Sequence, residues 1–536
     1  MRYSRRSFVQ LAIALLSLSV GRASSADIVT WDATSTSWMT ATSWSGDAFP
    51  TATDIGLFNS NSNPGSNLAG IDFGSPNVNN GAGNTAIGAL ESTRTSALTI
   101  RNTSTTTAGT LTLNGATVAT TVGGGATSNV IVRHAGSTTW TLSNGTGSAL
   151  AMEVALPNPT NVIAIDGAGT LVINSSIKGA GGIILMRNSG TARLDLGGVN
   201  SYEGDTVVDS GRARFRVADG TPHGSMAGDF YVNAGSQFGI DVSNEINGLN
   251  DGDDGGGIVD NDATTPQTLT IGDNNATSSF SGSIKNTSGT ATAALSVTKK
   301  GNGTLTLSGD NSYIGATTIN GGTLLVNGTH AGLAGSPQVS TAAADYAVND
   351  TGTLGGIGTI EAVVVVNSGG TIAPGQSAGT FTVGGLTMTN SSFASFELEN
   401  TSGAHSAGGA SDYLDIVGLL NLSGVTTSFT LSVEDDAVDD AVLTAEGSWI
   451  LASYNNLTAG SFDINTNVVV TGIGGGLSYA LELIETGGTT GDLKLTTTAI
   501  PEANTFLAIG LVAVGTGFAG LVCRRRQVRA DGGIAI

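Results

Sequence analysis

The stretch GNGTLTLSGDNSYIGATTINGGTLLVN runs from Gly301 to Asn327 and contains the pattern that decides the fold. Apolar residues occupy every second position in its TLTL and TLLV segments, which is typical of a β-strand with one face turned inward. Gly, Asn and Asp separate these short runs and supply the backbone conformations that tight turns need. The stretch therefore predicts a unit of strand, turn, strand, turn and strand.

An earlier copy, GTARLDLGGVNSYEGDTVVDSGRARFRV, runs from Gly190 to Val217 and aligns with this stretch without gaps. The shared positions are core-filling or turn-forming residues, namely Leu194 with Leu305, Leu196 with Leu307, Gly198 with Gly309, Asn200 with Asn311, Tyr202 with Tyr313, Gly204 with Gly315, Thr206 with Thr317, and Gly211 with Gly322. One unit alone exposes a strand edge and an apolar face, so it becomes stable only when the next unit stacks on it. The repeat predicts a stack of rungs.

Weaker alternating runs recur outside these best copies, which span 190–217 and 301–327. They begin at Leu98, Leu111, Val130, Trp140, Val162 and Leu171. Their spacing suits the strands and corners of a solenoid and leaves no room for helices between them. We therefore predict an all-β fold with a parallel β-helix over residues 96–385. The alternative is a series of β-sandwiches, which would be expected to have more aromatic residues and longer strands.

Residues 386–498 keep the alternation but lack the copy motif. Leu414, Ile416, Leu420 and Leu422 fall on one parity. We expect a less regular β section or an end cap here, because an open last rung would be an exposed strand edge that invites polymerisation.

The composition excludes several classes of partner. Only 12% of the 536 residues are charged, and the net charge is −21. Binding to DNA or RNA requires clustered Lys and Arg, so no nucleic-acid partner is expected. Cations or neutral glycans suit the surface better. The single cysteine, Cys523, rules out an internal disulfide, so stability must come from packing.

The amino terminus has the features of an export signal. Residues 1–26 combine a basic start, an apolar stretch and small residues before Asp27. The segment SRRSFVQ, which contains Arg5 and Arg6, resembles a twin-arginine signal. An ordinary secretory signal fits the same residues, so either export translocon is a partner to consider.

The carboxyl terminus has the features of a membrane segment. Residues 506–523 carry no charge and, as a helix, would span about 27 Å, which matches the hydrocarbon core of a bilayer. Arg524, Arg525 and Arg526 follow directly and favour the cytoplasmic side. We therefore predict a single transmembrane helix at 506–523.

Residues 500–527 also resemble the PEP-CTERM sorting signal, through Pro501 and Glu502, the apolar helix and the arginine cluster. Ala503 stands where that family usually has proline. The resemblance implies an exosortase-like membrane transpeptidase as partner. It also implies a protein that is anchored in the inner membrane in transit and then reaches the cell surface or extracellular matrix.

The body resembles the autotransporter-associated β-strand repeat family. The resemblance rests on Gly303–Val326, on the degenerate earlier copy and on GGTIAPGQSAGTFTVGG from Gly369 to Gly385. It also rests on a tryptophan-rich start at 27–95 that contains Trp31, Asp32, Trp38, Trp44, Ser45, Pro50, Asp54 and Phe58. It implies a right-handed β-helix whose amino-terminal cap is 27–95. The chain shows no strands of a translocating barrel, so we expect other machinery to export it.

The best candidate site is an acidic loop, NDGDDGGGIVDND, with Asp251, Asp253, Asp254, Asp260 and Asp262. Clustered acids occur in polysaccharide-cleaving β-helix enzymes, but no Lys or Arg accompanies them here. Several carboxylates on a flexible backbone also suit calcium, although the EF-hand pattern is broken at Gly255. We expect no cofactor other than this calcium ion, and an acidic surface loop is the alternative.

Two further sets of residues were considered. The histidines His134, His223, His330 and His405 show no metal-ligand spacing and are expected to be solvated loop residues. Arg212, Arg214 and Arg216 alternate with Ala213 and Phe215, which places three cations on one strand face. That face would bind an acidic glycan or simply face solvent.

These patterns predict an exported structural or adhesin-like β-helix protein of the cell surface or extracellular matrix. It would be non-catalytic and would present a repetitive surface to extracellular polysaccharide or neighbouring cells. One alternative is a carbohydrate-active β-helix enzyme, either a polysaccharide lyase or a hydrolase. Another is a single-pass membrane protein whose tail is never cut.

Overall fold

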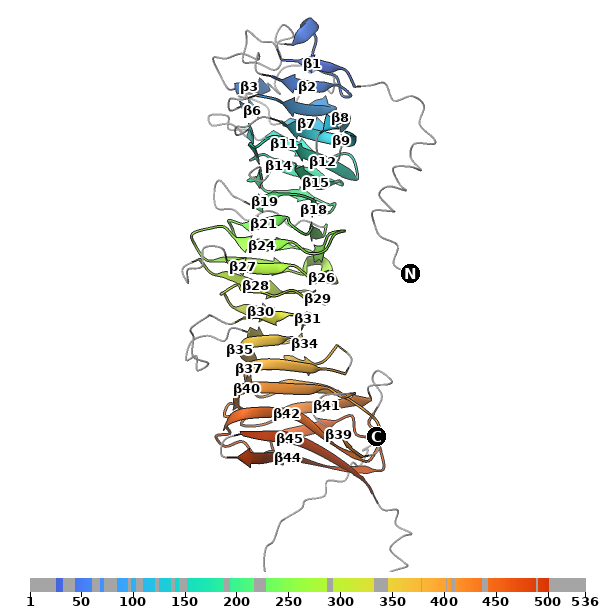
Figure 1. Ribbon diagram of the computed structural model, residues 1–536, viewed down its shortest axis with the longest axis vertical. Coiled ribbons are helices and arrows are strands. Elements are labelled where there is room, and N and C mark those ends of the chain that lie inside the picture. Colours follow the sequence, from blue (N-terminus) through green and yellow to red (C-terminus); the bar gives the residue numbers. More distant parts are fainter. Residues whose placement is uncertain are drawn as a thin grey trace, which may run out of the picture. The chain divides into compact units, whose positions relative to one another are not determined.

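The computed structural model describes residues 26–31, 44–59, 68–71, 84–94, 98–102, 109–120, 125–135, 140–143, 152–187, 193–215, 228–286, 293–331, 346–376, 378–401, 403–405, 410–435, 442–487 and 490–500. Strands β1 to β45 make up nearly all of the regular structure, and the described helices are the short 3-10 turns η2 (Ser45–Asp47) and η3 (Asp273–Asn275). The chain forms two compact units, which divide after Thr317. Each unit is built of strands stacked in successive rungs (Figure 1).

Unit 1 contains three main parallel sheets, which we number sheets 1 to 3. Sheet 1 runs, in spatial order, through β1 (Ile28–Thr30), β2 (Ile55–Phe58), β5 (Ala89–Ser92), β9 (Gly125–His134), β12 (Thr160–Ile165), β15 (Gly182–Arg187), β18 (Thr206–Val208), β20 (Phe230–Val232) and β23 (Leu249–Asp251). In addition, β8 (Ala116–Thr120) pairs antiparallel with β9.

Sheet 2 runs through β3 (Leu68–Ile71), β6 (Leu98–Asn102), β10 (Trp140–Ser143), β13 (Thr170–Ile173), β16 (Arg193–Leu196), β19 (Arg212–Phe215), β21 (Gln237–Ile240), β24 (Ile258–Asn261) and β27 (Ser283–Asn286). Sheet 3 runs through β4 (Asn84–Ile87), β7 (Gly109–Leu113), β11 (Met152–Ala155), β14 (Ser176–Gly179) and β17 (Ser201–Tyr202). The later rungs of unit 1 add β22 (Asn244–Ile246), β25 (Gln267–Ile271), β26 (Ser278–Phe280), β28 (Leu295–Lys299) and β29 (Thr304–Leu307).

From β2 to β17, each turn of the chain visits the three sheets in order and then starts the next rung. Thus β12, β13 and β14 are followed by β15, which pairs parallel with β12. The registers keep like positions on top of one another, so Leu171 lies beside Leu194 and Ile163 beside Leu185. All four side chains are buried. This is the architecture of a parallel β-helix, and the parallel pairing argues against the antiparallel sheets of β-sandwiches.

The repeat motif has a direct structural explanation. The side-chain oxygen of Asn311 accepts a hydrogen bond from the backbone N–H of Ile284 at 2.9 Å, and Asn200 does the same for Ile177 at 3.0 Å. Each asparagine therefore satisfies a backbone donor on the preceding rung.

The motif tyrosines act in the same pairwise way. Tyr313 is buried, and its hydroxyl lies 2.6 Å from the Thr317 hydroxyl; Tyr202 and Thr206 repeat the contact at 2.5 Å. The glycine between them has no room for a side chain, because a Cβ on Gly315 would lie 2.3 Å from the Leu295 carbonyl oxygen. The asparagine and the glycine of the motif therefore hold one rung against its neighbour, and the tyrosine and threonine link two residues of the same rung.

An aromatic cluster lies at the amino-terminal end of the unit 1 core. Trp44 packs edge-on against Trp31 with ring centroids 5.0 Å apart, and Phe58 lies 5.6 Å from both. Trp140 follows at 6.4 Å from Phe58. All four rings are buried. The tryptophans at this end of the chain therefore fill the interior of the first rungs.

Unit 2 contains sheets 4 and 5. Sheet 4 runs through β33 (Tyr346–Val348), β35 (Thr359–Val366), β37 (Thr380–Met388), β40 (Tyr413–Asn421), β42 (Gly447–Thr458), β45 (Thr490–Ala499) and β44 (Leu477–Gly487), with β32 (Thr329–His330) beside β35 and β39 (Gly403–His405) beside β42. Sheet 5 runs through β31 (Gly322–Val326), β34 (Gly352–Gly356), β36 (Thr371–Pro374), β38 (Phe393–Leu398), β41 (Phe429–Asp435) and β43 (Val468–Thr471). The strand at the division between the units is β30 (Thr317–Ile319).

The long strands of sheet 4 share an irregularity at matching positions. The register shifts between Ile360 and Val363 in β35, and again one rung later in β37 and then in β40. A bulge bends a strand. Residues on both sides of it remain buried, including Val383 and Leu386 in β37. One bent strand therefore lines two sides of the interior.

The carboxyl-terminal end of unit 2 changes its pairing. Parallel rungs continue as far as β42 and β43, after which β45 pairs antiparallel with β42, and β44 pairs antiparallel with β45. The predicted alternation in this region is confirmed, since Leu414, Ile416, Leu420 and Leu422 are all buried. Residues 386–498 thus contain both regular rungs and a terminal hairpin.

The sequence located the strands correctly. The runs predicted at Leu98, Leu111, Val130, Trp140, Val162 and Leu171 fall in β6, β7, β9, β10, β12 and β13. The export signal at 1–26 lies outside the described residues, apart from Ala26. So do Pro501, Glu502, the helix predicted at 506–523 and Arg524–Arg526. Within the described part of the chain, no helix has the length and hydropathy to cross a bilayer.

Candidate functional surfaces

The acidic loop does not form one site. Asp251 ends β23 in sheet 1, and its carboxylate accepts a hydrogen bond from the backbone N–H of Ser281 at 2.6 Å. Asp253 and Asp254 are exposed in a turn that is closed by a bridge between Gly252 and Gly255. These three acids therefore lie at the sheet 1 side of their rung.

The other two acids of the loop lie in sheet 2. Asp260, in β24, is buried and accepts a hydrogen bond from the Gln237 side-chain amide at 3.1 Å. Asp262, directly after β24, forms an ion pair with Arg212. The five predicted ligands are thus divided between two sheets. Within the described ranges, no three His, Cys, Asp or Glu side chains lie close enough together to hold a metal ion.

The arginine strand is engaged with carboxylates. Arg214 donates two hydrogen bonds to Asp195, at 3.0 and 2.8 Å, and lies 2.8 Å from Asp241. Arg193 also contacts Asp195, at 3.2 Å. The side chain of Asp195 is only 1% exposed and that of Arg214 only 11%. Arg216 lies outside the described residues.

The arrangement stabilises the charged form of Arg214. Burial by itself would lower the pKa of this guanidinium, but the hydrogen bond to Asp195 and the charges of Asp195, Asp241 and Asp262 outweigh it and raise the pKa. Gly239 leaves the space that the side chains of Asp262 and Arg214 occupy. A Cβ at that position would lie 2.1 Å from an Asp262 carboxylate oxygen and 3.2 Å from Arg214 Cγ.

We call this set of side chains the sheet 2 charge network; its members are Arg193, Asp195, Arg212, Arg214, Asp241 and Asp262. Arg214 is largely buried, so the expectation that it faces solvent is wrong, whereas the side chain of Arg212 is 32% exposed. Their charges are taken up by carboxylates from neighbouring rungs. The ion pairs thus link neighbouring rungs of sheet 2.

A smaller network of the same kind lies on sheet 1. Arg133 donates to Asp166 at 2.6 Å and also bonds to Glu91, which belongs to the neighbouring strand β5. Burial raises the pKa of the Glu91 carboxyl, and the opposing attraction of Arg133 offsets only part of this effect. Charges between rungs are therefore paired on two faces of unit 1.

Two histidines correct the expectation of solvated loops. His134 is buried beside Trp140, with ring centroids 5.8 Å apart. His330 is buried with its Nδ1 2.6 Å from the Tyr346 hydroxyl. Both lie at the ends of strands, at positions whose side chains point into the interior and there contact an aromatic ring. His223 lies outside the described residues, and the structure places His405 in β39 without describing its side chain.

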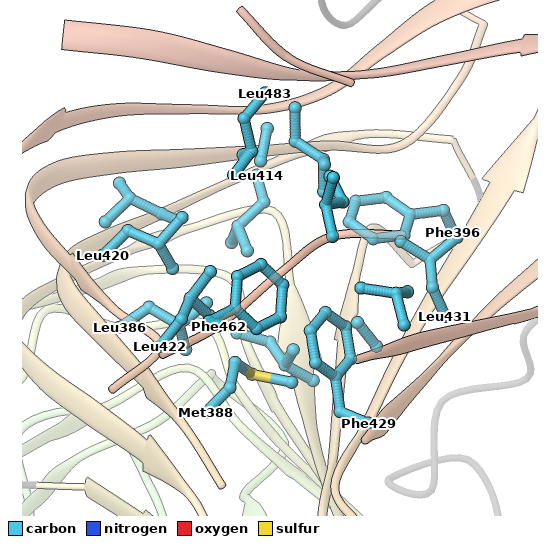
Figure 2. Close-up of a pocket in the computed structure, with 17 residues that line it drawn as sticks. Leu386, Met388, Phe396, Leu414, Leu420, Leu422, Phe429, Leu431, Phe462 and Leu483 are labelled. Carbon is cyan, nitrogen blue, oxygen red and sulfur yellow. The ribbon is translucent and has the colours of Figure 1, made fainter. Parts of the chain in front are cut away.

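Unit 2 contains a small internal cavity of about 40 Å³. Its lining is apolar and includes Met388, Phe429, Phe462, Leu483 and Leu493. Figure 2 shows Phe429, Phe462 and Met388 directed into one space. A space of this size holds about one water molecule and offers no group that could transfer a proton. It is a gap in the core of the rungs and lacks the polar groups of a ligand site.

The outer face of sheet 5 differs from the faces above. One column of residues in register, repeated from rung to rung, consists of Thr323, Thr353, Thr371, Phe393, Thr430 and Val469. Phe393 is 39% exposed and Val469 is 49% exposed. Beside them lie Ser395, Ser432 and Thr471, also on neighbouring strands. We call these two columns the sheet 5 face. They contain no charged residue, and Glu397 and Glu434 occupy the next outward positions on β38 and β41. This face cannot be recognised in the sequence, because its members are spread over successive rungs.

The comparisons with known proteins concern the repeat. The model of the passenger-associated-transport-repeat family matches residues 188–212 and 297–326. These ranges overlap the two best copies found in the sequence. These two segments are therefore similar to the passenger-associated-transport repeat.

A similar protein is the adhesin BmaC autotransporter of Brucella suis biovar 1 (strain 1330). It is 31% identical over 277 residues, which is 48% of this chain. The chain spans only 8% of the length of that adhesin.

Proposed function

We propose that this chain is an exported, surface-associated adhesin-like protein that works by presenting β-helical faces and performs no catalytic turnover. The observation that carries the proposal is the match of both repeat copies to a passenger repeat, together with the similarity to an autotransporter adhesin. The stacked rungs support it, since a β-helix of this kind offers extended, regular outer faces.

The proposal includes the route to the surface. Residues 1–26 would direct export through a translocon, and the tail at 500–527 would hold the chain in the inner membrane until an exosortase-like transpeptidase processes it. Arg5, Arg6, Pro501 and Glu502 are the residues on which these steps would depend. Calcium forms no part of this proposal, because the loop acids are divided between two sheets.

The contact surface that fits this function best is the sheet 5 face. Sugar rings present C–H groups and hydroxyls together, and an exposed aromatic ring flanked by hydroxyl side chains matches both. The absence of charge on this face favours a neutral glycan over a polyanion, because the net charge of the whole chain is −21 and would repel the latter.

The route and the location are tested on cells. Cells expressing the chain should be fractionated, intact cells should be treated with protease, and both termini of the mature protein should be measured by mass spectrometry. Surface exposure, with loss of residues 1–26 and of Arg524–Arg526, is the expected outcome. Retention of the arginines on an inner-membrane protein would support the plain single-pass alternative.

The contact surface is tested by sedimentation with insoluble neutral polysaccharides. Phe393→Ala should reduce the bound fraction several-fold, since it removes the aromatic platform. Val417→Ala is the matched control, because Val417 is 42% exposed on sheet 4 instead. Equal loss of binding in both variants would argue against this surface. Cleavage of the glycan by the wild type would argue against a non-catalytic role.

A further inference from the structure

Two carboxylates border the sheet 5 face. On β38 the outward positions are Phe393, Ser395 and Glu397 in turn, because the residues that alternate with them are buried. On the neighbouring strand β41, Ser432 lies beside Ser395 and Glu434 lies beside Glu397. These two strands therefore present an aromatic ring, then hydroxyls and then carboxylates along one direction of the sheet.

The inward residues of the two strands fix the direction of these side chains. Phe396 of β38 and Leu431 of β41 line the internal cavity, and Figure 2 shows both beside it. Since alternate residues of a strand point to opposite faces, Glu397 and Glu434 point outward. Both are partly exposed. Neighbouring strands lie about 4.8 Å apart, so the two carboxylates stand side by side on the outer surface.

The charge of this border favours a cationic ligand. Like charges in register on neighbouring strands destabilise a sheet. No strand of sheet 5 contains lysine or arginine, and the one such residue between positions 318 and 500 is Lys494, which lies on β45 in sheet 4. A metal ion fits poorly, because no three His, Cys, Asp or Glu side chains of the described residues come close enough together to hold one. An organic cation matches the pair better.

We propose that the sheet 5 face and the pair Glu397 and Glu434 together bind a polysaccharide of amino sugars in which some amines are not acetylated. The proposal rests on the function proposed above and specifies the class of glycan. A sugar ring stacks on Phe393, which is 39% exposed. Sugar hydroxyls bond to Ser395 and Ser432, and a sugar ammonium group lies between the two carboxylates, where its hydrogen bonds are charge-assisted.

The spacing of the three kinds of group sets the size of the ligand. Phe393 and Glu397 are four residues apart on an extended strand, which corresponds to about 13 Å. A single sugar ring cannot reach from the aromatic ring to the carboxylates. An oligosaccharide that lies along the strands can contact both, so we expect several linked sugar units to bind and a single amino sugar to bind weakly.

The test is calorimetric titration of the purified full chain in detergent with two ligands of equal length. One is the glucosamine tetrasaccharide from chitosan, and the other is the N-acetylglucosamine tetrasaccharide from chitin. At about pH 6 the carboxylates are ionised. The glucosamine ligand should bind roughly 10-fold more tightly, because its amines are charged. Glu434→Gln should remove most of this preference and leave affinity for the acetylated ligand unchanged. Phe393→Ala should weaken both ligands several-fold.

Two controls separate a specific role of Glu434 from general effects. Glu361→Gln changes the net charge equally, at an exposed residue of β35 in sheet 4, and it should leave the preference intact. Without ligand, Glu434→Gln should raise the apparent midpoint of thermal unfolding by about 1 to 3 °C, because it removes the repulsion by Glu397. A lowered midpoint would mean that Glu434 serves the fold, and it would contradict the proposal.

The titrations have three further outcomes that overturn the proposal. Equal affinity for the two tetrasaccharides would do so and would leave contact with a neutral glycan standing. A preference that falls as much in Glu361→Gln as in Glu434→Gln would mean that the acidic chain attracts cations in general. Competition by a polylysine peptide as strong as that by the glucosamine ligand would indicate a cationic protein as the partner. Binding of neither tetrasaccharide would overturn both this proposal and the assignment of the sheet 5 face as the contact surface.

Discussion

The sheet 2 charge network and the sheet 5 face show two ways of filling the outward columns of a β-helix. In both, parallel in-register stacking places residues of successive rungs side by side. On sheet 2, arginines and aspartates of neighbouring rungs form ion pairs, and the carboxylate of Asp195 is almost completely buried. On sheet 5 the column carries hydroxyl, aromatic and aliphatic groups that remain available. The charged face therefore links neighbouring rungs, and the sheet 5 face is the better candidate for contact.

The largest effect is expected where a buried charge loses its partner. Arg214→Met leaves Asp195 buried among fewer cations, and it should lower the free energy of unfolding by about 3 to 5 kcal/mol. Denaturant unfolding followed by circular dichroism measures this. The double variant Asp195→Leu with Arg214→Met should recover part of the loss, because the buried carboxylate is removed together with its main partner while Arg193 and Asp241 are in contact with solvent. Ser432→Ala on the sheet 5 face should change stability by less than about 0.5 kcal/mol. Equal losses in Arg214→Met and Ser432→Ala would remove the distinction between the two faces.

A pH-dependent effect is expected at Lys299, a buried lysine that has no place in either face. Its Nζ donates to the carbonyls of Lys300 and Gly301, and burial lowers its pKa from 10.5 to about 8. Between these pH values the folded chain has lost a proton that the unfolded chain keeps, so stability should rise with pH. The rise should be about 1 to 3 kcal/mol across that window.

Urea unfolding at pH 8 and at pH 10 measures the effect at Lys299. The rise should disappear in Lys299→Met and persist in Lys300→Met. A wild type whose stability is flat or falls over this range would contradict the assignment.

The turns that lead into sheet 5 offer a test within unit 2. Gly369 has φ 80°, and a Cβ there would lie 2.1 Å from an Asp350 carboxylate oxygen. Gly369→Thr should therefore destabilise the unit by about 2 kcal/mol. One rung earlier, Thr351 occupies the left-handed region at φ 64°. Thr351→Gly should be neutral or stabilising by up to about 1 kcal/mol, because relief of strain competes with the entropy of glycine. Thermal unfolding compares the two, and similar losses in both would show that φ does not decide these turns.

The smallest effect is expected at the motif tyrosines, and it should be the same in both copies. Tyr313→Phe removes the hydrogen bond to buried Thr317, and Tyr202→Phe removes the equivalent bond to Thr206. Each should cost about 1 kcal/mol. Chemical denaturation of the two variants measures this. A loss confined to one copy would mean that the two repeats do not serve the same structural role.

The sequence predicted the strands well because alternation is a local property. Leu305 and Leu307 indicate an inward face without knowledge of any neighbour, and the structure buries both. The charge network was not predictable in this way. Arg214 pairs with Asp195 on the preceding rung and with Asp241, which follows the next strand of the sheet. The turns between rungs differ in length, so the register of neighbouring strands cannot be read from the sequence. The same reason explains why the acidic loop looked like one site. Residues close in sequence, such as Asp251 and Asp262, are carried to different sheets when the chain turns a corner.

Gly239 has a mechanical consequence. Hydrogen bonds between rungs point along the stack, so tension on the ends of such a stack opens them one layer at a time. Gly239 in β21 has no side chain, so Asp262 has room to approach Arg212. Arg212 lies on β19 and Asp262 directly follows β24, so their ion pair links two rungs that are separated by the rung of β21. The three rungs spanned by this ion pair would have to detach together. Unfolding under tension should therefore be interrupted at this segment of unit 1.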